Sequence, residues 1–320
     1  MSTTYTPAPP RREMFQVFAE TLEELFQKNP RPVYLDADLM GSMKTSGLWE
    51  SYPDRVFNCG IQEANMVGVA CGMALNGYRP IIHSFSPFAI RRVFDQLAVS
   101  VVYAEKSVRV VGSDAGICAS WNGGTHMCFE DVAMVRSLPN ACLVDVSDAV
   151  MFADLLTQSV DWPGLTYFRT ARRGRPDLYS DQEIFEKGKG KVLAEGDDAT
   201  IIASGIQVSE ALKAAALLQQ RGIAVRVIDV ITVKPLDEPL ILESATKTGL
   251  LVVTENASIY GGLGEAVCGV VAEEQPVPVI RNGIRDRVGQ TGSEEWLKEQ
   301  YGISAADIVS DVLHGLKKFK

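Results

Sequence analysis

Short apolar segments alternate with helical segments along this chain, and that alternation constrains the fold more than any other feature. VYLDAD, PIIHSF, VRVVGS, CLVDV and LTYFRT are short and mostly apolar, and the stretches between them carry apolar residues at helical spacing. Strands that are apolar throughout are buried on both faces, as in a parallel sheet covered by helices. The sequence therefore predicts an α/β fold with a parallel sheet.

A second alternation begins after the polar stretch RRGRPDLYSDQEIFEKGKG, with the strand-like ATIIASG, the helix-like SEALKAAALLQQRG and the strand-like AVRVIDV. A length of 320 residues also favours two domains. We expect a flexible, Thr- and Pro-rich tail over residues 1–10 and a first domain over 11–178. A linker over 179–196 then leads to a smaller α/β domain over 197–320.

Charge and composition narrow the class of partner. The net charge of -9 argues against nucleic acid and anionic membranes, although a few local cations can still bind a small anion. The six cysteines show no Cys-X-X-Cys spacing, which favours buried thiols over a zinc site or a disulfide framework. We find no apolar run of membrane-spanning length and no export signal, so we expect a cytoplasmic protein.

The stretch FNCGIQEANMVGVACGM predicts a buried helix from about residue 61 to residue 76, with Glu63 in its first turn. A glutamate there complements the positive end of the helix, which is a purely structural use. The alternative is chemical, because a carboxylate in an apolar, water-poor pocket can act as a general acid or base near neutral pH.

Three stretches favour the chemical reading. GIQEANMVG, SFSPFAIRRVFDQL and GGTHMCFEDVAMVRSLPN together resemble the pyrimidine-binding domain of transketolase and its thiamine diphosphate relatives. DVITVKPLDEPLI and VVTENASIYGGLGEAV resemble the smaller C-terminal domain of that family. The GGLG turn after Glu255 could hold phosphate at a helix start, but the resemblance implies that this domain serves mainly in dimer packing.

The resemblance implies a role for Glu63 and for a ring pocket around it. In the family, a glutamate at this place hydrogen-bonds N1′ of the cofactor's aminopyrimidine and promotes its imino tautomer. Phe88 and Phe85 match the aromatic positions beside that ring, with Phe88 the better candidate for stacking. His126 matches a residue of the substrate channel and is the second catalytic candidate, because an imidazole can donate to sugar hydroxyls and relay protons.

The resemblance also implies contacts around the rest of the site. Asp38 matches an aspartate near the thiazolium, and Ser42 matches a serine near the far end of the substrate. Arg12 and Arg169 match positions that bind a sugar phosphate, where two guanidiniums could hold one anion. Loop capping explains an Asp or a Ser equally well, and a solvated arginine is common at a domain edge.

The sequence departs from the family pattern at three substrate-binding positions. Trp121 and Asn122 replace an acidic pair whose second member reads a sugar hydroxyl. Asp114 stands where family members have a histidine, and His83 replaces a small hydroxyl residue. An amide in place of an acid and a lost cation predict that His83, Asp114 and Asn122 face an unusual donor or acceptor.

Half of the expected cofactor site is missing from this sequence. Thiamine diphosphate is held through Mg²⁺ by a Gly-Asp-Gly motif followed by Asn, and the 320 residues contain no Gly-Asp-Gly. The resemblance therefore implies a chain with no metal site of its own and a partner subunit that carries this motif and holds the diphosphate and Mg²⁺. An α2β2 assembly with two sites is expected, because such sites pair around a two-fold axis.

The first hypothesis for function is the C-terminal subunit of a split transketolase, which transfers a two-carbon ketol unit from a ketose to an aldose, both sugars anionic. The beta subunit of 2-oxo acid dehydrogenases has the same two domains and lacks the same half, so it is the second. Deoxyxylulose phosphate synthase ranks third, because it is one long chain. A non-catalytic paralogue remains an alternative, although such a protein has no need for a buried carboxylate.

Overall fold

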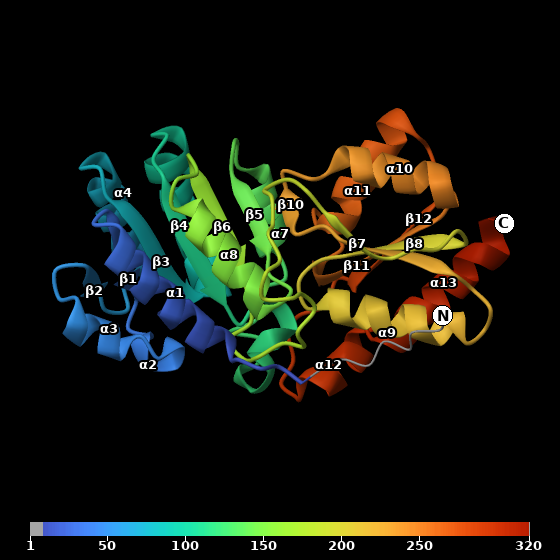
Figure 1. Ribbon diagram of the computed structural model, residues 1–320, viewed down its shortest axis with the longest axis horizontal. Helices are drawn as coiled ribbons and strands as arrows, with labels where there is room; N and C mark the ends of the chain where they lie inside the picture. Colours follow the sequence, from blue (N-terminus) through green and yellow to red (C-terminus); the bar gives the residue numbers. More distant parts are fainter. Residues whose placement is uncertain (1–8, 320) are drawn as a thin grey trace.

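The computed structural model describes residues 9–319, so residues 1–8 of the predicted tail lie outside it. The chain forms two mostly parallel sheets, each covered by helices on both faces, and the two sheets lie side by side (Figure 1). The α/β class predicted from the sequence is confirmed.

The first sheet has seven strands in the order β10-β5-β6-β4-β3-β1-β2, all parallel except β10. Its strands are β1 (Pro32–Asp36), β2 (Val56–Asn58), β3 (Arg79–Phe85), β4 (Val108–Ser113), β5 (Cys142–Asp145), β6 (Leu165–Arg169) and β10 (Thr232–Lys234). The strand β3 is buried from its second residue to its last, as expected for a strand covered on both faces. Its register pairs Asp36 with His83 and Phe85 with Ser113, which places the polar Asp36, His83 and Ser113 toward the carboxyl ends of the strands.

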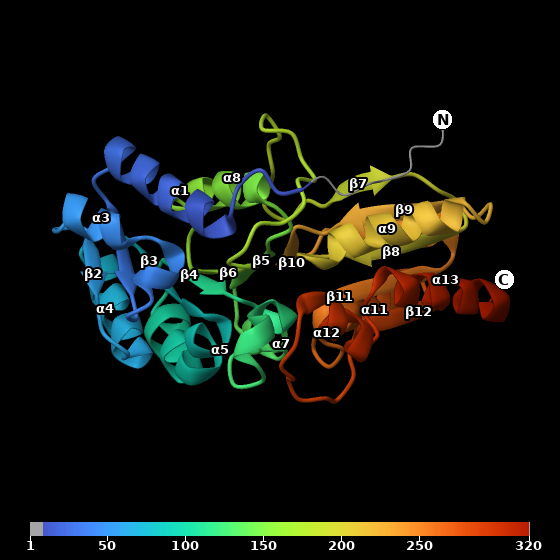
Figure 2. The same ribbon diagram turned by 90° about the horizontal axis from the view of Figure 1, so that it is seen from below.

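Helices cover the two faces of this sheet, as Figure 2 shows. The helices α1 (Met14–Lys28) and α8 (Ala149–Ser159) pack together on one face. The other face carries α4 (Glu63–Leu75), α5 (Ser86–Ala89), α6 (Phe94–Gln96), α7 (Asp131–Ser137), the 3-10 turn η1 (Arg91–Val93) and the π-helix η2 (Leu97–Tyr103). Two short helices, α2 (Met40–Met43) and α3 (Ser46–Ser51), follow β1, and the 3-10 helix η3 (Gly116–Asn122) follows β4.

The second sheet has the order β12-β11-β8-β9-β7, with β7 antiparallel to β9. Its strands are β7 (Lys191–Ala194), β8 (Ala199–Ala203), β9 (Val225–Asp229), β11 (Leu251–Ser258) and β12 (Val279–Ile284). The helices α9 (Gln207–Gln219) and α13 (Ala305–Phe319) contact each other on one face, and α10 (Glu238–Thr248) and α11 (Leu263–Glu274) on the other. The helix α12 (Glu294–Tyr301) packs against η3 of the first domain.

The structure differs from the sequence expectations in three places. The strand β7 falls inside the predicted linker but belongs to the second sheet. The strand β10, from the second half of the chain, completes the first sheet beside β5. The helix expected after β3 is broken into α5, η1, α6 and η2, with non-helical backbone angles at Ile90 and Val93.

Candidate active site

Some of the predicted site residues gather near the ends of β3 and β4, together with the start of α4. The carboxyl ends of parallel strands are the usual place for ligands in such folds, because the loops that follow are free of the sheet. Of the predicted residues, the structure brings Glu63, Phe85, Phe88, His126 and Asp114 to this edge.

Glu63 is the first residue of α4 and is only 3% exposed. Its Oε1 accepts a hydrogen bond from Nη1 of Arg92 at 2.7 Å and a longer one from Oγ of Ser84 at 3.3 Å. A buried carboxylate without such partners would be costly to keep ionised. Ser84 lies near the end of β3, and Arg92 lies in η1, shortly after that strand. The fold of this segment therefore determines which groups pair with Glu63.

Phe85, Phe88 and His126 form an aromatic cluster next to Glu63. The His126 ring centroid lies 5.4 Å from that of Phe88 and 5.9 Å from that of Phe85, in edge-on arrangements. Oγ1 of Thr125 lies 2.9 Å from Nδ1 of His126. The guanidinium of Arg92 lies 3.9 Å over the Phe88 ring, so Arg92 contacts both this cluster and Glu63.

Arg172 and Asp114 form an ion pair beside this cluster. Nε of Arg172 lies 3.1 Å from Oδ2 of Asp114, and the guanidinium lies 5.8 Å from the centre of the Phe85 ring. Burial raises the pKa of Asp114, and the charge of Arg172 opposes that rise. The Arg172 side chain is 26% exposed while Asp114 is nearly buried, so Arg172 is the member of the pair that a ligand can reach.

His83 belongs to a buried polar chain beneath the site. Its Nδ1 lies 2.8 Å from Oδ2 of Asp36 and its Nε2 lies 3.0 Å from Oγ of Ser113, with no exposed surface. The Tyr34 hydroxyl donates to the same carboxylate at 2.6 Å. The prediction that His83 contacts substrate is therefore corrected: both ring nitrogens are already bonded inside the sheet.

Arg169 is likewise placed away from any substrate. Its side chain is buried, with Nε 2.9 Å from Oδ2 of Asp131 and Nη1 3.4 Å from Oδ1 of Asp145. Its Nη2 donates to the backbone oxygen of Asn256 at 2.5 Å, which joins the two domains. The prediction that Arg169 binds a sugar phosphate is therefore corrected, because its guanidinium is already bonded to two carboxylates and a backbone carbonyl.

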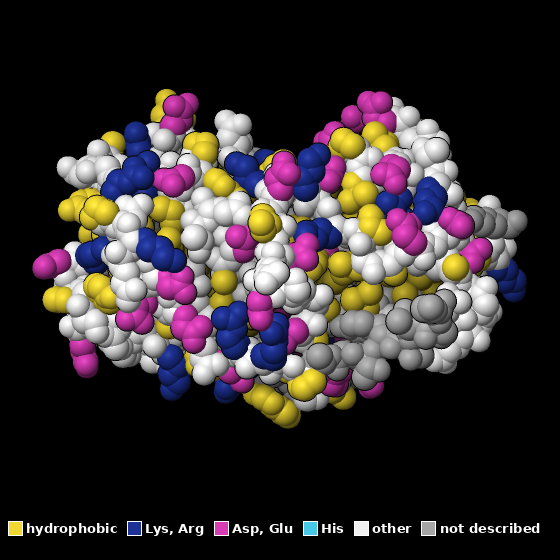
Figure 3. Space-filling model, viewed as in Figure 1, with side chains coloured by type: hydrophobic (Ala, Val, Ile, Leu, Met, Phe, Trp, Pro, Cys, Tyr) yellow, Lys and Arg dark blue, Asp and Glu magenta, His cyan; other side chains and the backbone are white. Residues whose placement is uncertain are grey.

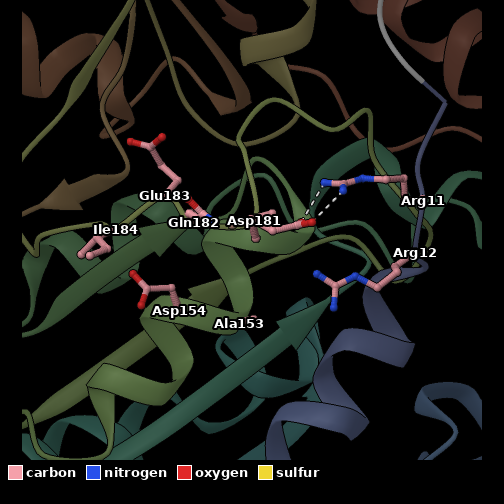
Figure 4. A pocket seen from close by; sticks show the side chains of 9 residues that line it. Arg11, Arg12, Ala153, Asp154, Asp181, Gln182, Glu183 and Ile184 are labelled. Atoms are coloured by element: carbon pink, nitrogen blue, oxygen red, sulfur yellow. Dashed lines mark hydrogen bonds and ion pairs between the residues drawn. The ribbon is translucent and has the colours of Figure 1, made fainter.

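Arg12 does not meet Arg169 around a common anion. Nη1 of Arg12 lies 3.6 Å from Glu20, and its side chain is 41% exposed. Figure 4 shows Arg12 and Arg11 lining a surface hollow between the start of α1, α8 and the segment 181–184, where Arg11 binds Asp181. This hollow contains acidic residues as well, and it is separate from the aromatic cluster.

The remaining predicted residues lie in loops or short helices. Asp38 is exposed, has a left-handed backbone (φ 64°) and accepts a hydrogen bond from the Asn58 side chain at 3.1 Å. Ser42 is half-buried in α2, and Asn122 is exposed at the end of η3. These placements leave Asp38, Ser42 and Asn122 accessible.

The GGLG turn shows why a glycine-rich helix start need not bind phosphate. Oε2 and Oε1 of Glu255 accept hydrogen bonds from the backbone amides of Leu263 and Gly264 at 2.7 and 2.9 Å. The carboxylate therefore occupies the anion position at the start of α11. Burial raises the pKa of Glu255 to about 7, against the effect of these two bonds.

Sequence reasoning missed Arg92 and Arg172. Arg172 lies three residues after Arg169, just beyond the end of β6, and site residues typically follow a strand rather than lie within it. That rule could have favoured Arg172. Arg92 lay inside the quoted motif SFSPFAIRRVFDQL, but neither charge nor spacing distinguishes it from Arg91, which pairs with Glu130 instead.

Residues 9–319 contain no cluster of three or more His, Cys, Asp or Glu arranged to hold a metal ion. Within the same range, no helix has both the length and the apolar character needed to cross a membrane. On the face shown in Figure 3, basic and acidic side chains are interspersed.

Comparison with known proteins agrees with this organisation. Residues 11–176 match the transketolase pyrimidine-binding domain, and residues 188–308 match the transketolase C-terminal domain. A 6-deoxy-6-sulfo-D-fructose transketolase subunit (SqwH) from a Clostridium species is 44% identical over 292 residues, which are 91% of each chain. An apulose-4-phosphate transketolase subunit of Phocaeicola vulgatus is 32% identical, over 94% of this chain and 96% of its own.

Longer relatives and solved structures extend the comparison. Human transketolase is 32% identical over 94% of this chain, which spans only 48% of the human protein. A solved structure described as a split gene transketolase, inactive beta4 tetramer, superposes with a TM-score of 0.87 at 38% identity, covering 96% of this chain and 99% of that one. The chain therefore belongs to the transketolase family and consists of its pyrimidine-binding and C-terminal domains.

Proposed function

We propose that this chain is one subunit of a split, thiamine diphosphate-dependent transketolase, which transfers a two-carbon ketol unit from a ketose to an aldose. The observation that carries the proposal is the buried Glu63 carboxylate, whose partner Arg92 lies over the face of the Phe88 ring. A carboxylate in that setting suits a partner that is flat and nitrogen-bearing, because the ring can stack while a nitrogen shares a proton with the acid.

The residues present fit the aminopyrimidine half of the cofactor. Phe88 offers an aromatic face and Glu63 a buried acceptor, and Ser84 helps to orient that acceptor. Thiamine diphosphate, when bound, would supply the carbanion chemistry of ketol transfer. The diphosphate and Mg²⁺ find no matching motif in this sequence, so we assign them to a partner subunit.

The chain's own residues would then have separate tasks. Glu63 would hold a proton at the pyrimidine ring nitrogen. Thr125 contacts Nδ1 of His126 and so leaves Nε2 for a substrate oxygen. Arg172 would bind the anionic end of the sugar in place of the predicted Arg169, because it is an accessible guanidinium beside the cluster. Asp38, Ser42 and Asn122 remain candidates for contacts with the cofactor or the sugar.

The need for a partner is supported by an uncovered apolar surface. The helix α4 was expected to be buried, but Gly68, Val69 and Leu75 are exposed on it, and Val99 and Tyr103 are exposed on the neighbouring η2. A helix that is apolar on all sides needs cover on all sides. We propose that the diphosphate-binding subunit and a second copy of this chain provide it in an α2β2 assembly.

The substrates are proposed from two similar proteins. One is described as acting on 6-deoxy-6-sulfo-D-fructose and another on apulose 4-phosphate, so both handle sugars with an anionic end group. Arg172, held by its ion pair with Asp114, is a partly exposed guanidinium beside the aromatic cluster that could bind such a group. We therefore expect an anionic ketose donor and an aldose acceptor for this chain too.

The test is reconstitution with the partner captured from the native host. Assembled wild-type protein should transfer ketol units between sugars, and Glu63→Gln should lower kcat by at least about a hundredfold. Glu238→Gln is the matched control, because Glu238 also lies in the first turn of a helix but is exposed. Pyruvate decarboxylation without ketol transfer, or a Glu63→Gln rate within a few-fold of wild type, would refute the proposal.

A further inference from the structure

Arg92 makes two contacts that a bound aminopyrimidine would also need. Its guanidinium, a flat cation, lies 3.9 Å over the Phe88 ring. Its Nη1 donates a 2.7 Å hydrogen bond to Oε1 of Glu63. A ring that stacked on the same face of Phe88 and donated to the same oxygen of Glu63 would meet the Arg92 guanidinium, because two flat groups cannot lie in the same place.

Arg92 is also the part of this arrangement that can move. Its side chain is 44% exposed, whereas the Glu63 side chain is 3% exposed. It extends from η1, a single 3-10 turn that follows the non-helical Ile90 and ends at Val93, whose backbone angles are also non-helical. Rotation of the Arg92 side chain toward solvent would uncover both Phe88 and Glu63 without moving the sheet.

We infer that Arg92 closes the pyrimidine pocket when the cofactor is absent and leaves when the ring binds. The guanidinium keeps the buried Glu63 charge paired in the chain alone, where an unpaired buried carboxylate would be costly. It must then be displaced, so it competes with the cofactor and lowers its apparent affinity. This inference rests on the proposed function, because it takes the Glu63 and Phe88 pocket to be the pyrimidine site.

The neighbouring Arg91 provides a matched control. It is 47% exposed, comes from the same turn and forms a 2.7 Å ion pair with Glu130 rather than with Glu63. Arg91→Met and Arg92→Met remove the same charge one residue apart. Methionine at position 92 still covers Phe88 with an apolar, flexible chain but can neither donate to Glu63 nor stack as a cation.

The first experiment measures binding of thiamine diphosphate with Mg²⁺ to the assembled complex by titration calorimetry. We expect Arg92→Met to bind about tenfold more tightly than wild type, since it loses both a cation–π contact and a charge-assisted hydrogen bond in the free state. Arg91→Met should match wild type. Equal or weaker binding by Arg92→Met would overturn the inference while leaving the proposed function intact. A wild-type complex that binds no thiamine diphosphate would refute the proposed function, and this inference with it.

The second experiment needs no cofactor. Thermal unfolding of the chain alone is measured for Arg92→Met, Glu63→Gln and the double variant, with circular dichroism to confirm that each is folded. If Arg92 pairs with Glu63 in the free chain, the Arg92→Met loss in Tm should be clearly smaller when Glu63 is already Gln. Strictly additive shifts in Tm would show that the two residues are not coupled, and would overturn the inference.

Discussion

Arg172 pairs with Asp114 at 3.1 Å, at the edge where β4 and β6 end and beside the ring of Phe85. The pair joins an accessible guanidinium to a nearly buried carboxylate, so the cation is held in one place without being enclosed. This geometry distinguishes Arg172 from the buried Arg169 and makes it our candidate for binding the anionic end of the sugar.

Replacing Arg172 should therefore weaken substrate binding more than chemistry. We expect Arg172→Ala to raise KM for an anionic donor by about tenfold or more, with a smaller change in kcat, because a charge-assisted contact is lost. Arg173→Ala is the control, since Arg173 is an exposed neighbour. Steady-state kinetics of the reconstituted enzyme measure the effect, and an unchanged KM would remove Arg172 from the site.

Arg169 should matter for stability instead. Arg169→Met would leave Asp131 and Asp145 buried without their cation, and breaking a buried pair in this way costs about 3 to 5 kcal/mol. Arg31→Met, which removes an exposed partner of Asp161, should cost less than about 1 kcal/mol. Urea unfolding gives both free energies. A small effect of Arg169→Met would contradict the buried network described here.

Glu255 should make stability depend on pH. Its pKa is raised from 4.5 to about 7 in the folded chain by burial, so the folded state binds more protons than the unfolded state between these values. Stability contributed by protonated Glu255 is therefore complete below about pH 4.5 and falls as pH rises through 7, by on the order of 3 kcal/mol.

The Glu255→Gln variant should lose this part of the pH dependence. Unfolding free energies of wild type and variant, measured across pH 5 to 8, should converge at low pH and separate at high pH, with the variant more stable there. Asp229, whose pKa burial raises to about 6, adds a slope of the same sign in both proteins. Glu265→Gln, at an exposed position of the same helix start, should keep the wild-type slope.

The exposed face of α4 should be required for assembly. Val69→Lys places a charge on this face, at a side chain already 37% exposed, so the chain alone should stay folded. We expect it to lose association with the partner subunit in size-exclusion chromatography with light scattering, because a buried unpaired charge is costly. Val288→Lys, on a different exposed apolar residue, should assemble normally. Normal assembly of Val69→Lys would mean that another surface binds the partner.

The sequence was sufficient for the architecture because the pattern of apolar strands and helices is repeated and strong. It also favoured Glu63, Phe85, Phe88 and His126, which lie in dense motifs and which the structure brings close together. It could not show that β10 crosses to the first sheet, since a three-residue strand carries too little pattern. The break at Ile90 was hidden for a related reason: apolar residues keep helical spacing through it.

The errors at Arg169 and His83 have a common physical origin. Both residues lie on strands, where a side chain can point into the protein or toward the strand end. The sequence alone does not predict which side chains from other segments it will contact. Arg169 meets two buried carboxylates, and His83 meets Asp36 and Ser113. Such pairs join segments far apart in the sequence, so a local sequence pattern cannot predict them.

The central claim is that this chain provides the pyrimidine half of a thiamine diphosphate site that a partner completes. The most direct measurement is calorimetric titration of thiamine diphosphate with Mg²⁺ into the chain alone, into the partner alone and into their mixture. The account predicts one cofactor per chain in the mixture and no tight binding by either chain alone. Tight binding by the chain alone, or no binding by the stoichiometric mixture, would contradict it.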